Sequence, residues 1–147
     1  MKKINSHAPV KCCKKVFIHA PVEKVWRILT DIDKWTNWQK AVTYSKINGE
    51  LIPGTTFDWK SGGLKIQSTL HTVETFEYLG WTGKSLGSLA IHNWILKDIH
   101  GKTEVLVEES MEGLFVKLLN KVFNRVLEKG MIASLEQLKQ VSEKITV

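Results

Sequence analysis

A histidine and a glutamate, His92 and Glu109, are the residues of this chain best suited to acid–base chemistry. Both lie in segments where polar and apolar residues alternate, which is typical of strands with one buried face. Alternation places His92 on the face of Trp94 and Glu109 on the face of Val107, so both are expected to point inward. If these strands are neighbours, imidazole and carboxylate would form a pair that could move protons at working pH.

Three tryptophans, Trp59, Trp81 and Trp94, are predicted to face the same interior. Indoles offer a large apolar area, and a buried indole N–H seeks an acceptor. A mostly apolar interior with a few polar groups is what a small-molecule site needs. The alternatives are ordinary core positions for the indoles and for His92, and a helix cap or surface ion pair for Glu109. The predicted ligand-binding residues are Phe57, Trp59, Ser68, Leu70, Trp81, His92, Trp94, Val107, Glu109 and Val126.

The elements that must position these side chains are mainly strands. A first strand is predicted from Cys13 to His19, where Val16 and Ile18 share a face. Six more follow at about 42–48, 55–60, 64–75, 77–84, 87–98 and 103–110. Short turns rich in glycine, asparagine and proline join them, as these residues favour turn backbones. The pattern predicts an antiparallel meander of seven strands.

Two short helices are predicted between the first two strands. Pro21 suits the first turn of a helix, and the apolar stripe of this helix runs from Val22 to Leu29 at helical spacing. Asp31 is a good N-cap for a second helix that ends near Asn37. The tryptophans of this region are expected to be structural; they are Trp26, Trp35 and Trp38.

One long amphipathic helix is predicted from about Gly113 to Val141. Its apolar stripe begins with Phe115, Leu119, Val122, Val126 and, a little to one side, Phe123. Beyond Gly130 the stripe is rotated and consists of Leu127, Met131, Leu135 and Leu138. This drift predicts a bend near Gly130. Gly130, Ala133 and Ser134 are small, so we expect unfilled volume beneath them; the alternative is that sheet side chains fill it.

Composition is that of an ordinary globular protein. The chain has 147 residues, with 43% apolar and 24% charged residues, and is expected to form one domain spanning 1–147. No apolar stretch is long enough for a membrane span, so we do not expect stable membrane insertion. No secretory signal is recognisable, so we expect a cytoplasmic location. Cys12 and Cys13 are adjacent and are expected to be reduced thiols. Neither a metal site nor a cofactor is expected.

The net charge is +6, and much of it lies near the start of the chain, at Lys2, Lys3, Lys11, Lys14 and Lys15. Such a patch could attract nucleic acid or an anionic membrane, or could simply aid solubility. The sequence has no zinc-finger spacing, no aromatic RNA-binding motif and no basic helix long enough to fill a groove. We therefore expect no nucleic-acid partner, and the oligomeric state is left open.

Several stretches carry a resemblance to a known superfamily. The opening reads Ile-His-Ala-Pro-Val-Glu-Lys-Val-Trp at 18–26, then Asp-Ile-Asp-Lys-Trp at 31–35, then Trp38. Later come Gly-Trp-Thr-Gly-Lys at 80–84, His-Asn-Trp at 92–94, and Thr-Glu-Val-Leu-Val-Glu-Glu-Ser-Met-Glu-Gly at 103–113. Over about residues 12–141 the chain resembles the START-related helix-grip superfamily, also called SRPBCC, which includes polyketide cyclase-like and lipid-transport proteins.

The resemblance implies an α+β helix-grip fold, in which a seven-stranded antiparallel curved sheet surrounds a long C-terminal helix. Two short helices lie between strands one and two. It also implies a cavity between sheet and helix that binds an apolar small molecule. The fold fixes no single function, because its members include carriers, metabolite binders, polyketide aromatase/cyclases and oxygenase domains. The oxygenase branch is disfavoured, since this sequence lacks a closely spaced cluster of two histidines and a carboxylate.

Three functions therefore compete. The favoured hypothesis is a carrier or sensor that binds a hydrophobic or aromatic small molecule in the internal cavity. The second is a cyclase/dehydratase-type enzyme that acts on a polyketide-like substrate with His92 and Glu109 as its acid–base pair. The third is a protein-interaction module, which predicts an interior filled to normal packing density.

Overall fold

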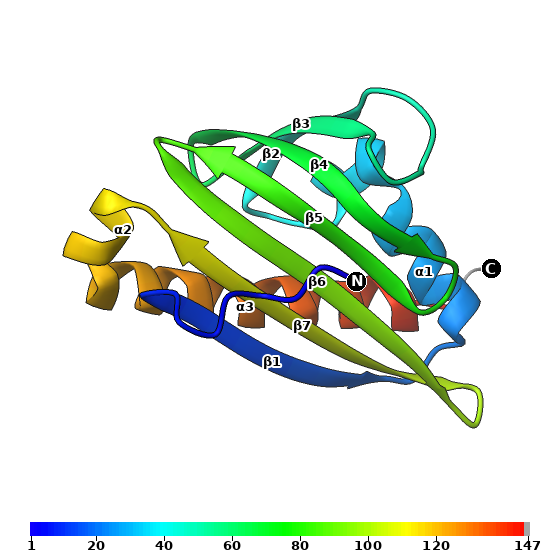
Figure 1. Ribbon diagram of the computed structural model, residues 1–147. Helices are drawn as coiled ribbons and strands as arrows, with labels where there is room; N and C mark the ends of the chain where they lie inside the picture. The colour runs from blue at the N-terminus through cyan, green and yellow to red at the C-terminus, as the bar shows by residue number, and fades with distance from the viewer. Residues whose placement is uncertain (146–147) are drawn as a thin grey trace.

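The computed structural model describes residues 1–145 and shows a curved antiparallel sheet with a long helix across one face (Figure 1). The seven strands lie in the order β1-β7-β6-β5-β4-β3-β2. This confirms the predicted α+β helix-grip fold. The strands are β1 (Val10–Ile18), β2 (Val42–Ile47), β3 (Thr56–Ser61), β4 (Leu64–Glu74), β5 (Tyr78–Ser85), β6 (Ser88–Ile99) and β7 (Lys102–Glu112).

Two short helices connect β1 to β2, as the sequence predicts. Helix α1 (Val22–Thr30) follows Pro21, and its apolar stripe from Val22 to Leu29 is buried. A 3-10 helix, η1 (Ile32–Asn37), comes next, and the indole N–H of Trp35 donates to the Leu29 carbonyl at 2.8 Å. Asp31 is the N-cap residue of η1, as predicted, but its side chain makes no capping hydrogen bond. Its carboxylate instead lies 3.1 Å from Lys34, one turn along η1.

The C-terminal helix differs from the prediction at its start. Instead of one helix from Gly113, a short helix α2 (Leu114–Leu118) is followed by α3 (Asn120–Glu143). Leu119 separates them with a non-helical backbone, and its N–H closes α2 by donating to the Phe115 carbonyl. The helix ladder is interrupted here, whereas it runs through Gly130 without a break.

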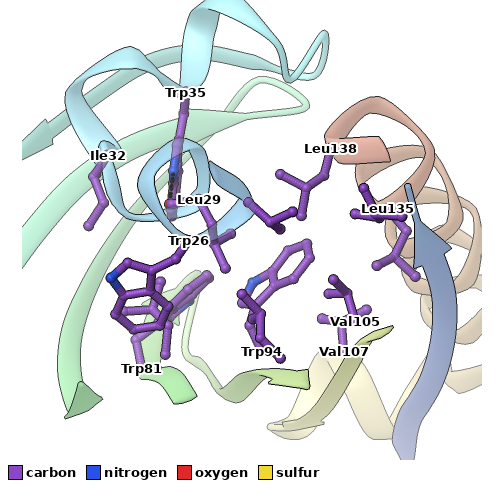
Figure 2. Close-up of a cluster of buried hydrophobic side chains, with 14 of the residues drawn as sticks. Trp26, Leu29, Ile32, Trp35, Trp81, Trp94, Val105, Val107, Leu135 and Leu138 are labelled. Atoms are coloured by element: carbon purple, nitrogen blue, oxygen red, sulfur yellow. Dashed lines mark hydrogen bonds between the residues drawn. The ribbon is translucent and has the colours of Figure 1, made fainter. Parts of the chain in front are cut away.

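The core lies between the sheet and the C-terminal half of α3. Figure 2 shows Leu135 and Leu138 pointing toward Val105 and Val107 of β7, with Leu29 of α1 beside them. Trp94 of β6 belongs to the same cluster of buried side chains. Because α1, α3 and the sheet meet here, these side chains are almost fully excluded from water. This end of the molecule is packed solid.

The N-terminal segment crosses the opposite, outer face of the sheet, over β6 and β7 (Figure 1). Asn93 of β6 donates to the Lys2 carbonyl at 2.8 Å, and the Asn5 N–H donates to Ser110 of β7 at 3.0 Å. The segment therefore covers Asn93 and Ser110 on the outer face and forms hydrogen bonds with both. One of the groups beside it is His71 of β4, whose ring lies against Gly80 and Asn93.

Candidate ligand-binding site

A cavity with two adjoining lobes lies between the concave face of the sheet and the first half of the C-terminal helical region. The larger lobe has a volume of about 690 Å³ and is bounded by β3 to β7, α2 and the start of α3. The smaller lobe, of about 300 Å³, extends beneath the middle of α3 to η1. The walls common to both are formed by Trp59, Leu64, Ile66, Trp81, His92, Glu109, Met111 and Phe123.

His92 and Glu109 form a pair in the shared wall. They are direct partners in the β6–β7 register, and His92 Nδ1 lies 2.5 Å from Oε2 of Glu109. The carboxylate accepts this hydrogen bond, which fixes the ring orientation. The two side chains are 14% and 15% exposed, so they meet the cavity with a small part of their surface. The predicted proximity of the two groups is confirmed, and their role in binding or catalysis stays a prediction.

The imidazole is packed between aromatic rings. Trp81 stacks on His92, with ring centroids 4.5 Å apart and an angle of 15° between the planes. The Trp94 ring is tilted against the imidazole, with centroids 5.7 Å apart. Nε2 of His92 and Nε1 of Trp94 are buried without a hydrogen-bond partner among the described residues. A buried polar group without a partner is costly, by about 1–3 kcal/mol.

The indole of Trp59 is also in the wall, and its N–H donates to Ser68 Oγ at 3.0 Å. Ser68 lines the larger lobe next to Gly83, where a side-chain carbon would approach the serine hydroxyl to 3.2 Å. The polar atoms at this side of the cavity are thus satisfied within the protein. The unsatisfied ones gather around His92 and Trp94.

Other predicted site residues lie elsewhere in the fold. Phe57, Leu70 and Val107 share the inward face but are fully buried in the adjoining core, and neither lobe touches them. Alternation identifies the face of a strand, but it does not show which part of the face another element covers. Val126 borders the smaller lobe from α3 and is 62% exposed, so it stands at the rim.

Sequence reasoning missed part of the wall. Ala90, Met111, Phe115 and Leu119 line the larger lobe. Strand alternation places Ala90 on the inward face with His92, although Ala90 is not among the predicted binding residues, and the same rule applied to Met111 puts it on the face of Glu109. Phe115 and Leu119 required knowledge of the break between α2 and α3.

The predicted volume beneath the small residues of α3 is confirmed. Gly130, Ala133 and Ser134 line the smaller lobe. Gly130 is exposed, and apart from its own helix no described atom lies within 4 Å of the position that a Cβ would occupy there. The smaller lobe therefore lies between these small residues and the sheet, and sheet side chains leave it unfilled.

Neither cysteine forms a disulfide. Cys12 is half-buried and Cys13 is exposed, and partial burial raises the pKa of both thiols. Within residues 1–145 no three His, Cys, Asp or Glu side chains are grouped as metal ligands. No helix in this part of the chain has the length and apolar character needed to cross a membrane.

Comparison with known proteins agrees with this architecture. The family model for polyketide cyclase / dehydrase and lipid transport matches residues 10–143. No curated protein matches the chain significantly in sequence.

Solved structures show the same fold at low sequence identity. A hypothetical protein of Helicobacter pylori, jhp0584, superposes with a TM-score of 0.85 at 20% identity, covering 97% of this chain and 98% of its own. The ZhuI aromatase/cyclase of Streptomyces sp. R1128 gives 0.80 at 12% identity, covering 90% and 93%. The protein TTHA0849 of Thermus thermophilus gives 0.75 at 16% identity, covering 88% and 94%.

Proposed function

This chain belongs to the polyketide cyclase / dehydrase and lipid transport family, and we propose that it is a carrier or sensor that binds an apolar, aromatic small molecule in its two-lobed cavity. The observation that carries the proposal is the larger lobe. Its volume of about 690 Å³ falls within the range of small-molecule sites, roughly 300–1,000 Å³. Its wall is apolar and aromatic apart from a few polar side chains, chiefly the His92–Glu109 pair.

The polar groups of the wall favour a ligand with one hydroxyl. The Trp94 N–H can only donate, so it needs an acceptor. With its Nδ1–H donated to Glu109, His92 has Nε2 left as an acceptor. A hydroxyl both donates and accepts, so it suits a wall that has a donor in Trp94 and an acceptor in His92. The rest of the ligand would contact Trp59, Trp81 and the apolar wall.

A matched pair of ligands tests the proposal. Naphthol and methylnaphthalene have the same ring system, and only the first has a hydroxyl. Both should displace anilinonaphthalene sulfonate, a dye that fluoresces in apolar sites. Naphthol should bind about tenfold more tightly, the worth of one good hydrogen bond. His92→Phe should remove this preference and leave methylnaphthalene unaffected.

Failure of both compounds to displace the dye would contradict the binding proposal. A naphthol preference that survives in His92→Phe would contradict only the assignment of the polar group. A circular dichroism melt of the variant controls for loss of folding.

A second function is favoured by the 2.5 Å contact between His92 and Glu109. Such a pair is a candidate acid–base group for cyclisation or dehydration of a polyketide-like substrate. If it acts so, wild type should convert a poly-β-ketone thioester, and His92→Gln should slow conversion about 100-fold or more. Product formation measured by mass spectrometry decides this, and equal rates in the two proteins would exclude the enzymatic role of His92.

A further inference from the structure

Apolar side chains that face water gather at the end of the molecule that holds the larger lobe. Leu86 in the β5–β6 turn is 77% exposed, Leu114 is 72% exposed and Leu118 is 69% exposed. Phe115, Leu119 and Val122 are also exposed. Scattered apolar residues on a surface are normal, whereas a contiguous group marks an interaction site. We name these six residues the α2 face.

The residues of the α2 face lie together at one end of the molecule. Figure 1 shows α2 and the start of α3 at the same end as the β5–β6 turn, far from the C-terminus. Gly113, the residue before α2, lies close to the turn, since a side-chain carbon on it would lie 3.0 Å from the Gly87 carbonyl oxygen. Leu86, Phe115 and Leu119 also line the larger lobe. The exposed apolar surface is therefore continuous with the cavity wall.

The charges around the α2 face are mainly positive, although Glu112 precedes α2 and accepts a hydrogen bond from Asn5. Between residues 114 and 127 the chain has Lys117, Lys121 and Arg125 and no acidic residue. Lys60, Lys65 and Lys84 line a hollow with Leu86, where the single acidic residue among the described lining residues is Asp58. Toward the C-terminus the next acidic residue is Glu128, whose Oε1 lies 2.8 Å from Lys14 Nζ and so already has a cation.

An exposed apolar surface surrounded mainly by cations favours one kind of partner over another. A second copy of the chain would bring the same cations against one another across the contact. A lipid bilayer with anionic head groups offers negative charge outside and apolar area just beneath it. Amphipathic helices with cationic flanks bind such surfaces by inserting their apolar side chains at the head-group boundary.

We propose that the α2 face docks this protein on the surface of an anionic lipid membrane. Leu86, Leu114 and Leu118 enter the head-group layer, and the lysines and the arginine contact lipid phosphates. Docking in this orientation places the mouth of the cavity against the bilayer. An apolar ligand then passes between membrane and cavity without crossing water. This last step rests on the proposed binding function, whereas docking itself does not.

The test is flotation of the full chain with vesicles of phosphatidylcholine containing phosphatidylglycerol. Wild type should float with these vesicles and stay in solution with pure phosphatidylcholine. Lys117→Gln with Lys121→Gln should lower the partition coefficient about 30-fold, because each cation near an anionic surface contributes about 1 kcal/mol. Leu114→Ser with Leu118→Ser should lower it more than about tenfold, through lost apolar insertion.

The matched control is Lys97→Gln with Lys102→Gln, which removes the same charge from the β6–β7 hairpin at the opposite end. It should float like wild type. Equal loss in this control would show general electrostatic adsorption and overturn the proposal. Wild type that fails to float would also overturn it.

Two further measurements separate the outcomes. A dimer in light scattering that the Leu114/Leu118 variant abolishes would assign the face to a second copy and contradict membrane docking. Anilinonaphthalene sulfonate displacement by naphthol should be unchanged in the Lys117/Lys121 variant. If naphthol displaces the dye but wild type does not float, ligand binding is supported and membrane docking is contradicted. If wild type floats but naphthol does not displace the dye, only the ligand-binding proposal is contradicted.

Discussion

The two ends of the space between sheet and C-terminal helix differ sharply. At one end, the side chains of Leu135 and Leu138 are buried against the sheet and α1. At the other, Leu114, Leu118 and Val126 are mostly exposed, and a cavity separates this half of the helical region from the sheet. The apolar pattern along the helix is similar in both halves, so the partner surface decides the outcome. The packed end supplies stability, and the open end is free to bind.

The largest expected effect is a loss of stability, and it is tested by substituting one residue from each end. Leu138→Ala should lower the free energy of unfolding by about 2–5 kcal/mol, because it leaves a cavity in a filled core. Val126→Ala removes carbon from an exposed rim and should change stability by less than about 0.5 kcal/mol. Urea denaturation measures both. Similar losses at the two positions would show that the open end contributes equally to the core.

A cavity-filling substitution tests the open end directly. Ala90 lines the larger lobe, so Ala90→Trp should occupy ligand space and weaken binding of anilinonaphthalene sulfonate at least about tenfold. Because free volume already exists there, stability should fall by less than the roughly 1–3 kcal/mol that overpacking a filled core costs. Dye titration and urea denaturation of the same protein check both parts. A large stability loss would mean that the lobe is too small for an indole.

Acidification should lower the stability of the protein through His71, which lies on the outer face of the sheet beside the N-terminal segment. Burial, helped by the positive charges of Lys2 and the amino terminus, lowers the pKa of His71 from 6.5 to about 4. The unfolded state therefore binds more protons between these values, so stability is full above pH 6.5 and falls as the pH drops toward 4. Melting temperatures across this range should decline less in His71→Gln than in wild type. Parallel curves for the two proteins would contradict the role of His71.

A small gain in stability is expected at the boundary of the two ends. Gly130 is inside α3 and faces free space, so a methyl group fits there. Gly130→Ala should raise the free energy of unfolding by about 0.5–1 kcal/mol, since glycine is the poorer helix former. Urea denaturation measures the gain. A loss instead of a gain would show that the backbone at Gly130 needs glycine's freedom.

Much of this architecture was predictable from the sequence because strand signals are local. Alternation and turn residues place the strands within a few residues, and the meander makes β6 and β7 neighbours. That is why the contact of His92 with Glu109 could be expected. The break at the start of the helical region could not be predicted, because the apolar residues from Phe115 to Val126 fit an unbroken helix equally well. Only the packed structure shows the break at Leu119 and the exposed α2 face.

The same limit applies along the cavity wall. Phe57, Leu70 and Val107 lie in the filled core and line neither lobe. They nevertheless share the inward face with Trp59, Trp81 and Trp94. Which part of the concave face stays open depends on where α1, η1 and α3 cross it. That is a property of tertiary packing, and the pattern of one strand does not contain it.

A crystal structure of the chain in complex with naphthol would show whether the open end binds ligand. We predict electron density for the ring system in the larger lobe, against Trp59 and Trp81, with the hydroxyl within hydrogen-bonding distance of His92 Nε2. Naphthol found only on the outer surface, with both lobes empty at saturating concentration, would show that the open end is not a binding site.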